Sequence, residues 1–199
     1  MTPRPVLQQR LQLLKQHHDE LESFFLGIES DVEAAYRTYK VTGIAMDIVA
    51  DVLVALVSLV DAGYKIAVLG ETEVSKMSFA ISALQFAYSP IRAVLQKLSN
   101  PAIQPGMIQP DLTGIRNAAA TVLGIIGNVL APSYWARVMA NIETGHWKTA
   151  FTRNPEQEIW QVQMALKQQR AASLEKMEAQ INKLEGELGM PLTFYVCKA

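Results

Sequence analysis

Cysteine is almost absent from this sequence: Cys197, close to the C-terminus, is the single thiol in 199 residues. One cysteine cannot form an internal disulfide, and no Cys/His spacing typical of zinc occurs, so we expect neither a disulfide framework nor a metal site. Long basic runs are also missing, and 18 Lys and Arg nearly balance 19 Asp and Glu. Without a basic stripe that could follow a phosphate backbone, nucleic-acid binding is not expected.

Known catalytic patterns are lacking as well. The chain has no Gly-rich phosphate loop, no GxSxG elbow and no HExxH pair. One cluster of possible ligands occurs, at His17, His18, Asp19 and Glu20. Neighbouring residues of a helix point about 100° apart, so we interpret this cluster as a solvated helix face with His18 in a seam. We therefore predict no enzyme, no catalytic residue, no cofactor and no small-molecule substrate.

Charge is scarce in the middle of the chain. Residues 1–40 carry eleven charged side chains, the much longer stretch 41–131 also carries eleven, and residues 132–199 carry fifteen. The first forty residues hold no short apolar run of the signal-peptide type, so we expect no secretory signal and a soluble precursor form. The length fits one domain. We predict a single helical domain with four zones: a charged heptad helix (1–40), an apolar helical zone (41–131), return helices (132–190) and a short tail (191–199).

Apolar residues near both ends of the chain recur in steps of three and four. This spacing is typical of a helix that packs along a partner helix. The seam of the first helix is predicted at Leu7, Leu11, Leu14, Leu21, Phe25 and Ile28, and the seam of the last helix at Leu174, Met177, Ile181 and Leu184.

Glycine and proline mark the expected helix boundaries. Pro5 suits a first helical turn, and the first chain reversal is expected around Gly63 and Gly70. The next helix is predicted over residues 72–98, with Thr72 as its N-cap and a kink at Pro90.

The second half of the chain shows similar signals. Three prolines and a glycine predict a loop over residues 99–110, followed by a helix that ends near Gly145. Asn154 and Pro155 are suited to open the last helix, which should stop at Gly189. Residues 192–196 form a short β-like run that either adds an edge strand or packs on the bundle.

These boundaries predict an all-α fold: an elongated antiparallel bundle of about four main helices. The first and last helices have similar lengths, so they are expected to pair antiparallel as a stalk around the apolar middle. Two arrangements remain open at this point. The middle zone forms either a separate tip at the end of the stalk or part of a plain four-helix, up-down bundle.

Two apolar stretches carry their few polar side chains on one narrow face. At 100° per residue, the polar residues of 43–62 fall within an arc of about 80°, and those of 117–136 within a similar arc. This pattern is expected around a polar interior inside an apolar surround. The predicted polar seam comprises Asp47, Asp51, Ser58, Asp61, Asn117, Thr121 and Asn128, and the predicted membrane- or partner-facing residues are Val52, Leu53, Leu56, Val60, Ile125, Ile126 and Trp135.

The aspartates decide how such a stretch could enter a membrane. Apolar residues of 43–62 favour insertion by about 3–7 kcal/mol, while each Asp near the centre opposes it by about 2.5–3.5 kcal/mol. A lone span is therefore not expected, and insertion would need several helices with the Asp seam turned inward. The alternative is a buried helix of a soluble bundle, in which Asp47 and Asp51 pair with a basic residue such as Arg92 or Arg116.

The leading functional hypothesis is a non-enzymatic helical protein that self-associates through its charged heptad helices and engages a membrane with residues 41–131, as a pore, channel or translocation component. In outline, a charged stalk with an apolar helical tip is similar to α-helical pore-forming toxins and to phage proteins ejected into a host envelope, which is an analogy of architecture only. The alternative is a soluble structural subunit or adaptor that binds other helical subunits. A third hypothesis, a magnesium enzyme using Asp47 and Asp51, lacks a second acidic motif.

Overall fold

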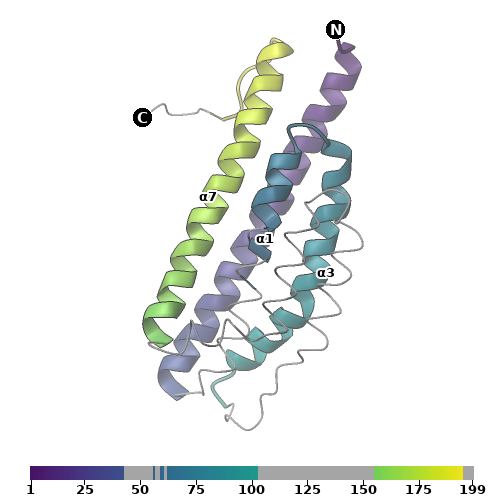
Figure 1. Cartoon of the computed structure of the whole chain (residues 1–199). Helices are drawn as coiled ribbons and strands as arrows, with labels where there is room; N and C mark the ends of the chain where they lie inside the picture. Colours follow the sequence, from purple (N-terminus) through teal and green to yellow (C-terminus); the bar gives the residue numbers. More distant parts are fainter. Residues whose placement is uncertain (43–55, 57–58, 61, 103–154, 195–199) are drawn as a thin grey trace.

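The computed structural model describes residues 1–42, 56, 59–60, 62–102 and 155–194. Its long helices are α1 (Arg4–Thr42), α3 (Val74–Leu98) and α7 (Pro155–Glu187), and residues 62–69 are helical as well. Figure 1 shows these helices packed side by side into an elongated bundle. The described part of the chain is all-helical and contains no strand, which confirms the predicted fold class.

Helices α1 and α7 pair antiparallel, as the sequence predicted (Figure 1). Lys15 Nζ lies 2.7 Å from Glu185 Oε1, and near the other end Glu29 Oε2 lies 3.0 Å from Arg170 Nη1. Residue numbers therefore rise along α1 as they fall along α7. The two ends of the chain meet as a result: Arg4 donates to the carbonyl of Leu188 over 3.0 Å.

Helix α3 runs beside α1 in the same direction. Arg10 Nη2 donates to the Gly70 carbonyl over 3.2 Å, and Thr38 Oγ1 donates to the Ser99 carbonyl over 3.1 Å. Residues 62–69 run the opposite way, since Gly63 approaches Phe25 and Gly70 approaches the N-terminal part of α1. Of the two arrangements that the sequence left open, residues 62–102 follow the second: they lie along α1 as in a four-helix bundle.

The chain direction alternates through these helices, so three of their ends share one end of the bundle. There α1 ends at Thr42, α3 ends at Leu98, and α7 begins at Pro155 (Figure 1). Residues 103–154 therefore leave and rejoin the described bundle at that end. The opposite end holds the N-terminus, the turn at 70–72 and the C-terminal end of α7.

The core of the described bundle is made of aliphatic and aromatic side chains from all of these helices. Its largest fully buried members include Phe25, Leu21, Ile66, Met77 and Leu84. Full burial of one such side chain contributes about 1.5–3 kcal/mol, so packing of these apolar faces is the main force that holds the bundle together.

Because residues 62–69 already run opposite to α1, the chain first reverses between Thr42 and residue 62, earlier than predicted. Residues 62–69 stay helical through Gly63, and the turn occupies residues 70–72. Gly63 serves packing instead: a Cβ there would come within 2.7 Å of the Phe25 ring. Gly70 is also a close-approach site, because a Cβ there would meet Gln180 Oε1 and lie 3.0 Å from Leu14 Cδ2.

The predicted N-cap of α3 is also wrong. Thr72 belongs to the preceding turn, where its N–H donates to the Leu69 carbonyl over 3.1 Å. The N-cap position is taken by Glu73, whose side chain makes no capping hydrogen bond but pairs with Lys76 Nζ at 2.9 Å. Helix α3 continues through Pro90 and ends at Leu98, close to the predicted position.

The end of α7 agrees with the expected stop. Gly189 adopts a φ of +67°, which glycine reaches without steric cost. Met190 N–H donates to the Glu185 carbonyl and Gly189 N–H to the Gly186 carbonyl, the two bonds of a Schellman motif. The described part of the tail, through Phe194, forms no edge strand and packs on the bundle instead.

Candidate functional site

Most residues of the predicted polar seam and membrane face lie outside the described ranges. This holds for Asp47, Asp51, Ser58, Asp61, Asn117, Thr121 and Asn128, and for Val52, Leu53, Ile125, Ile126 and Trp135. Leu56 and Val60 are described, and both are buried in the hydrophobic core. Their environment in this bundle is therefore protein.

The predicted heptad residues lie along the packed faces of α1 and α7. Leu11, Leu14, Leu21, Phe25 and Ile28 of α1 are buried, as are Met177, Ile181 and Leu184 of α7. Leu7 and Leu174 are half-buried. Because α1 also packs against α3 and residues 62–69, the seam belongs to a multi-helix core instead of an isolated two-helix coiled coil.

The interpretation of His17 as part of a solvated helix face is wrong, whereas His18 lies in the buried seam as predicted. Both rings are buried, although Asp19 beside them is exposed. His17 Nδ1 lies 3.3 Å from Glu20 Oε2, and its Nε2 is buried without a hydrogen-bond partner. The physical reason is that α1 packs against neighbours on two sides, so its buried surface is wider than a single seam.

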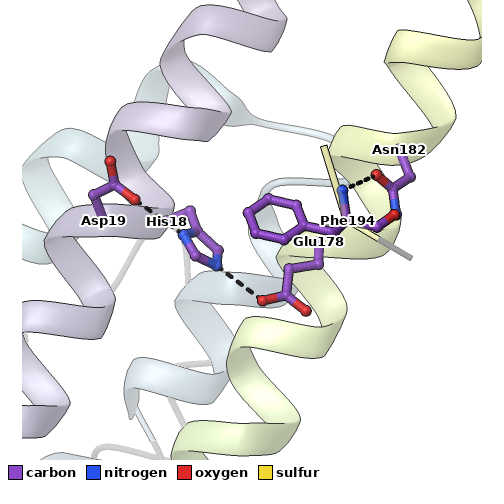
Figure 2. Close-up of polar contacts among 5 residues, drawn as sticks. All are labelled: His18, Asp19, Glu178, Asn182 and Phe194. Carbon is purple, nitrogen blue, oxygen red and sulfur yellow. Dashed lines mark hydrogen bonds and ion pairs between the residues drawn. The ribbon is translucent and has the colours of Figure 1, made fainter. Parts of the chain in front are cut away.

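Figure 2 shows the most elaborate polar site in the described bundle, where α1, α7 and the tail meet. His18 Nδ1 lies 3.2 Å from Asp19 Oδ1, and its Nε2 lies 3.2 Å from Glu178 Oε1. The Phe194 ring covers the imidazole, with ring centroids 4.9 Å apart. An imidazole thus links α1 to α7 and also forms part of the surface on which the tail rests.

The tail is held mainly through its backbone. The side chain of Asn182 receives the Phe194 N–H over 2.9 Å and donates to the Phe194 carbonyl (Figure 2). Glu185 accepts the Thr193 N–H over 2.6 Å and also the Thr193 hydroxyl. Since Glu178, Asn182 and Glu185 are spaced by four and three residues, they share one face of α7.

Glu185 is the most buried acidic group among the described residues, with 1% of its side chain exposed. Burial alone would raise the pKa of Glu185, but hydrogen bonds from Lys15 and from Thr193 outweigh it and lower the pKa. The carboxylate therefore stays ionised at neutral pH and connects α1, α7 and the tail.

Glu29 has the opposite balance. Burial raises the pKa of Glu29, although Arg170 and Lys167 act against it. Its Oε2 lies 3.0 Å from Arg170 Nη1 but makes no hydrogen bond, so the pair is held by charge alone. This contact fixes the α1–α7 register near the end where residues 103–154 attach.

A groove of about 610 Å³ is lined by residues of α1 and α3 on another side of the bundle. At its base, the Tyr88 hydroxyl donates to Asp31 Oδ2 over 2.5 Å, and Arg92 Nε lies 3.3 Å from the same oxygen. Burial, followed by the bond to Asp31, raises the pKa of Tyr88, so the phenol remains a proton donor in that bond. The Tyr88 hydroxyl therefore supplies neither a free nucleophile nor a free base to the groove.

A second groove, of about 660 Å³, lies near the turn at 70–72 and the C-terminal part of α7. Arg10, Lys176 and Lys183 line it together with Glu71 and Glu187. Arg10 is already bound to two carbonyls of the turn. Mixed charges of this kind do not select one ligand class.

Two features are absent from the residues that the structure describes. No group of three or more His, Cys, Asp or Glu side chains is gathered there in a way that could hold a metal ion. Within the same ranges, no helix has both the length and the apolar character needed to cross a membrane.

Comparison with known proteins identifies no relative: no family model matches the chain, and no curated protein or solved structure matches it either.

The site around His18 was only partly visible in the sequence. The heptad placed His18 in a seam, but nothing local signalled that Glu178 and Phe194 would face it across 160 and more residues. Asn182 and Glu185 look like ordinary solvated helix residues. Only the antiparallel register of α1 and α7, together with the reversal at Gly189, brings these groups together.

Proposed function

We propose that this chain is a non-enzymatic helical protein that is soluble as a bundle and engages a membrane through residues 117–136. Several copies would associate to form part of a pore, channel or translocation assembly. Two features support the proposal. Residues 117–136 carry no charged side chain, and the segment that contains them joins the described bundle at one end.

The observation that carries the proposal is the position of the attachment points. Ala102 follows the end of α3, and Pro155 begins α7, at the end of the bundle where α1 also ends (Figure 1). Residues 103–154 can therefore approach a membrane at that end while the contacts between α1 and α7 stay intact. A bundle that keeps its own core in this way is suited to deliver an apolar segment.

The sequence supplies the membrane chemistry. Residues 117–136 contain no charged side chain, and Tyr134 and Trp135 stand near the end of this run, where interfacial aromatic residues are expected. Asn117, Thr121 and Asn128 share one face. Polar faces of this kind avoid lipid when several copies associate around them, so self-association belongs to the proposal.

The first apolar stretch receives a smaller role in this proposal. Leu56, Leu59 and Val60 are already buried in the core of the bundle. Their transfer to lipid would require the bundle to open, at the cost of these contacts. The proposal therefore assigns membrane contact to the second stretch, on the basis of its uncharged sequence.

The test is release of a dye from anionic and neutral liposomes by the full-length protein, at acidic and neutral pH. We expect leakage by the wild type and its loss when Ile125→Lys and Ile126→Lys are combined, since each charge near a span centre costs about 2.5–3.5 kcal/mol. Gln12→Lys, on an exposed position of α1, is the matched control and should leak like the wild type.

Two outcomes would contradict the proposal. One is a wild type that neither binds lipid nor causes leakage under any of these conditions. The other is undiminished leakage by the double Lys variant. The variant Asp47→Leu with Asp51→Leu shows which of the two apolar stretches enters the bilayer, because it changes only the first. Leakage should be unchanged if only residues 117–136 enter.

A second candidate function is a soluble structural subunit that binds other helical proteins. Burial of Leu56 and Val60 inside the bundle favours it. So do Phe79 and Phe86, which lie seven residues apart on α3 with 71% and 58% of their surfaces exposed. A defined oligomer in plain buffer, without lipid binding, would select this function over the first.

A further inference from the structure

The docked tail is a contact between a short extended segment and a preformed surface. Residues 191–194 follow the Schellman turn and fold back onto α7, where Asn182 and Glu185 bind both sides of the Thr193–Phe194 backbone. Most of these bonds use main-chain atoms. The segment contributes only one half-buried apolar side chain, Phe194, so its attachment depends on few contacts and is easily reversed.

The Phe194 ring rests on an imidazole with an unusual pair of partners. Both ring nitrogens of His18 face carboxylates, Asp19 at Nδ1 and Glu178 at Nε2, each at 3.2 Å (Figure 2). Carboxylates accept hydrogen bonds but do not donate them. A neutral imidazole has one N–H and can satisfy one of the two; only the protonated ring, with two N–H groups, can satisfy both.

The charged groups around His18 also favour the protonated form of its ring. Lys15, one turn earlier on α1, is engaged by Glu185 at 2.7 Å, and His17 faces Glu20. Residues 191–194 carry no charge. Among the charged groups of α1 and α7, Asp19 and Glu178 are the two in contact with the ring.

We propose that residues 191–194 form a reversible tail segment whose docking on α1 and α7 is controlled by protonation of His18. With His18 protonated, both carboxylates are bonded, the ring is fixed across α1 and α7, and Phe194 packs on a cationic ring face. With His18 neutral, one nitrogen lone pair faces a carboxylate oxygen. That repulsion frees the ring to turn and removes the surface on which Phe194 rests.

The sign of the response follows directly. Docking is stronger while the ring is protonated and weakens as rising pH removes that proton. Glu185 sets a lower limit, because its lowered pKa keeps it ionised, and able to hold Thr193, until the pH falls well into the acid range. This inference concerns the bundle itself and does not depend on membrane contact.

Cys197 allows a direct test without a new cysteine, since it is the single thiol and lies three residues beyond Phe194. A nitroxide spin label is attached to Cys197 of the full-length protein at one pH, and its mobility is then recorded between about pH 5.5 and pH 8.5. We expect the ratio of mobile to immobile signal to rise by about tenfold to a hundredfold over this range, the effect of losing one charge-assisted hydrogen bond.

Three variants complete the experiment, each checked for helix content by circular dichroism. His18→Gln should remove the pH response, and Asn182→Ala should give a mobile label at every pH. His17→Gln, which changes the neighbouring buried histidine, should respond like the wild type. A label whose mobility does not change with pH in the wild type, or a full response in His18→Gln, would overturn the proposal.

Discussion

Phe25→Ala is expected to lower the free energy of unfolding by about 3–5 kcal/mol, the usual cost of removing a fully buried aromatic side chain. Phe25 is among the largest buried residues of the bundle, and it packs against both Phe24 and the backbone of Gly63. Leu26→Ala, at the next position on the exposed side of α1, is the matched control and should change stability by about 0.5 kcal/mol or less. Urea denaturation of the two variants measures the difference.

Gly63 provides an independent check of the same contact. A Cβ at Gly63 would lie 2.7 Å from the Phe25 ring, so Gly63→Ala alone should destabilise the protein despite alanine's higher helix propensity. Combining it with Phe25→Leu, which shortens the side chain, should recover part of that loss. Strictly additive effects in this double-mutant cycle would show that the two residues do not touch.

Lys15→Met should cost about 2–3 kcal/mol at pH 7, because it leaves Glu185 buried without its cation. Its matched control is Lys76→Met. Lys76 is exposed to a similar degree, 47% against 40%, and its ion pair is similar in length, 2.9 Å against 2.7 Å. The difference lies in the acid, since Glu73 is 42% exposed and Glu185 only 1%. An exposed pair contributes about 0–1 kcal/mol, so Lys76→Met should be nearly neutral.

The pH dependence gives this prediction a second readout. A lowered pKa in the folded state stabilises the protein above the unfolded-state pKa, and this stabilisation is lost as the pH falls through the folded-state value. In Lys15→Met, the effect of burial on Glu185 is no longer offset by Lys15. Protonation of Glu185 then removes the cost of burying an unpaired carboxylate. The stability gap between wild type and variant should therefore narrow from about pH 7 to about pH 4. A gap that stays constant would contradict the role assigned to Glu185.

Local sequence signals predicted the helices well where packing and capping agree with them. The proline at position 155 and the glycine at 189 mark the start and end of α7, and the heptad leucines identify its buried face together with that of α1. These features depend on short-range chemistry. They can be read from a window of a few residues, because capping and helical periodicity act within one or two turns.

The errors come from contacts that are distant in sequence. Gly63 was interpreted as part of a turn, because nothing nearby reveals that the Phe25 ring requires a small residue there. His17 was assigned to a solvated face, since a single heptad seam does not show that α1 packs against helices on two sides. The tail site around Glu185 was missed for the same reason. Long-range pairing decides each case, and it follows only from the completed bundle.

The antiparallel pairing of α1 and α7 within one chain underlies the tail site, the ion pairs and the common exit point of residues 103–154. An engineered disulfide tests it: Leu11→Cys with Leu184→Cys, in a background with Cys197→Ser, oxidised at low protein concentration. The bonds from Arg4 to Leu188 and from Lys15 to Glu185 place these two buried leucines at the same level of the seam.

Leu11→Cys with Leu166→Cys is the matched control, because 18 residues of helix separate Leu166 from Leu184, a distance of about 27 Å. We predict ready bridging within one chain for the first pair and none for the second. Bridging only between chains, or equal bridging by both pairs, would contradict the antiparallel pairing on which this account of the protein rests.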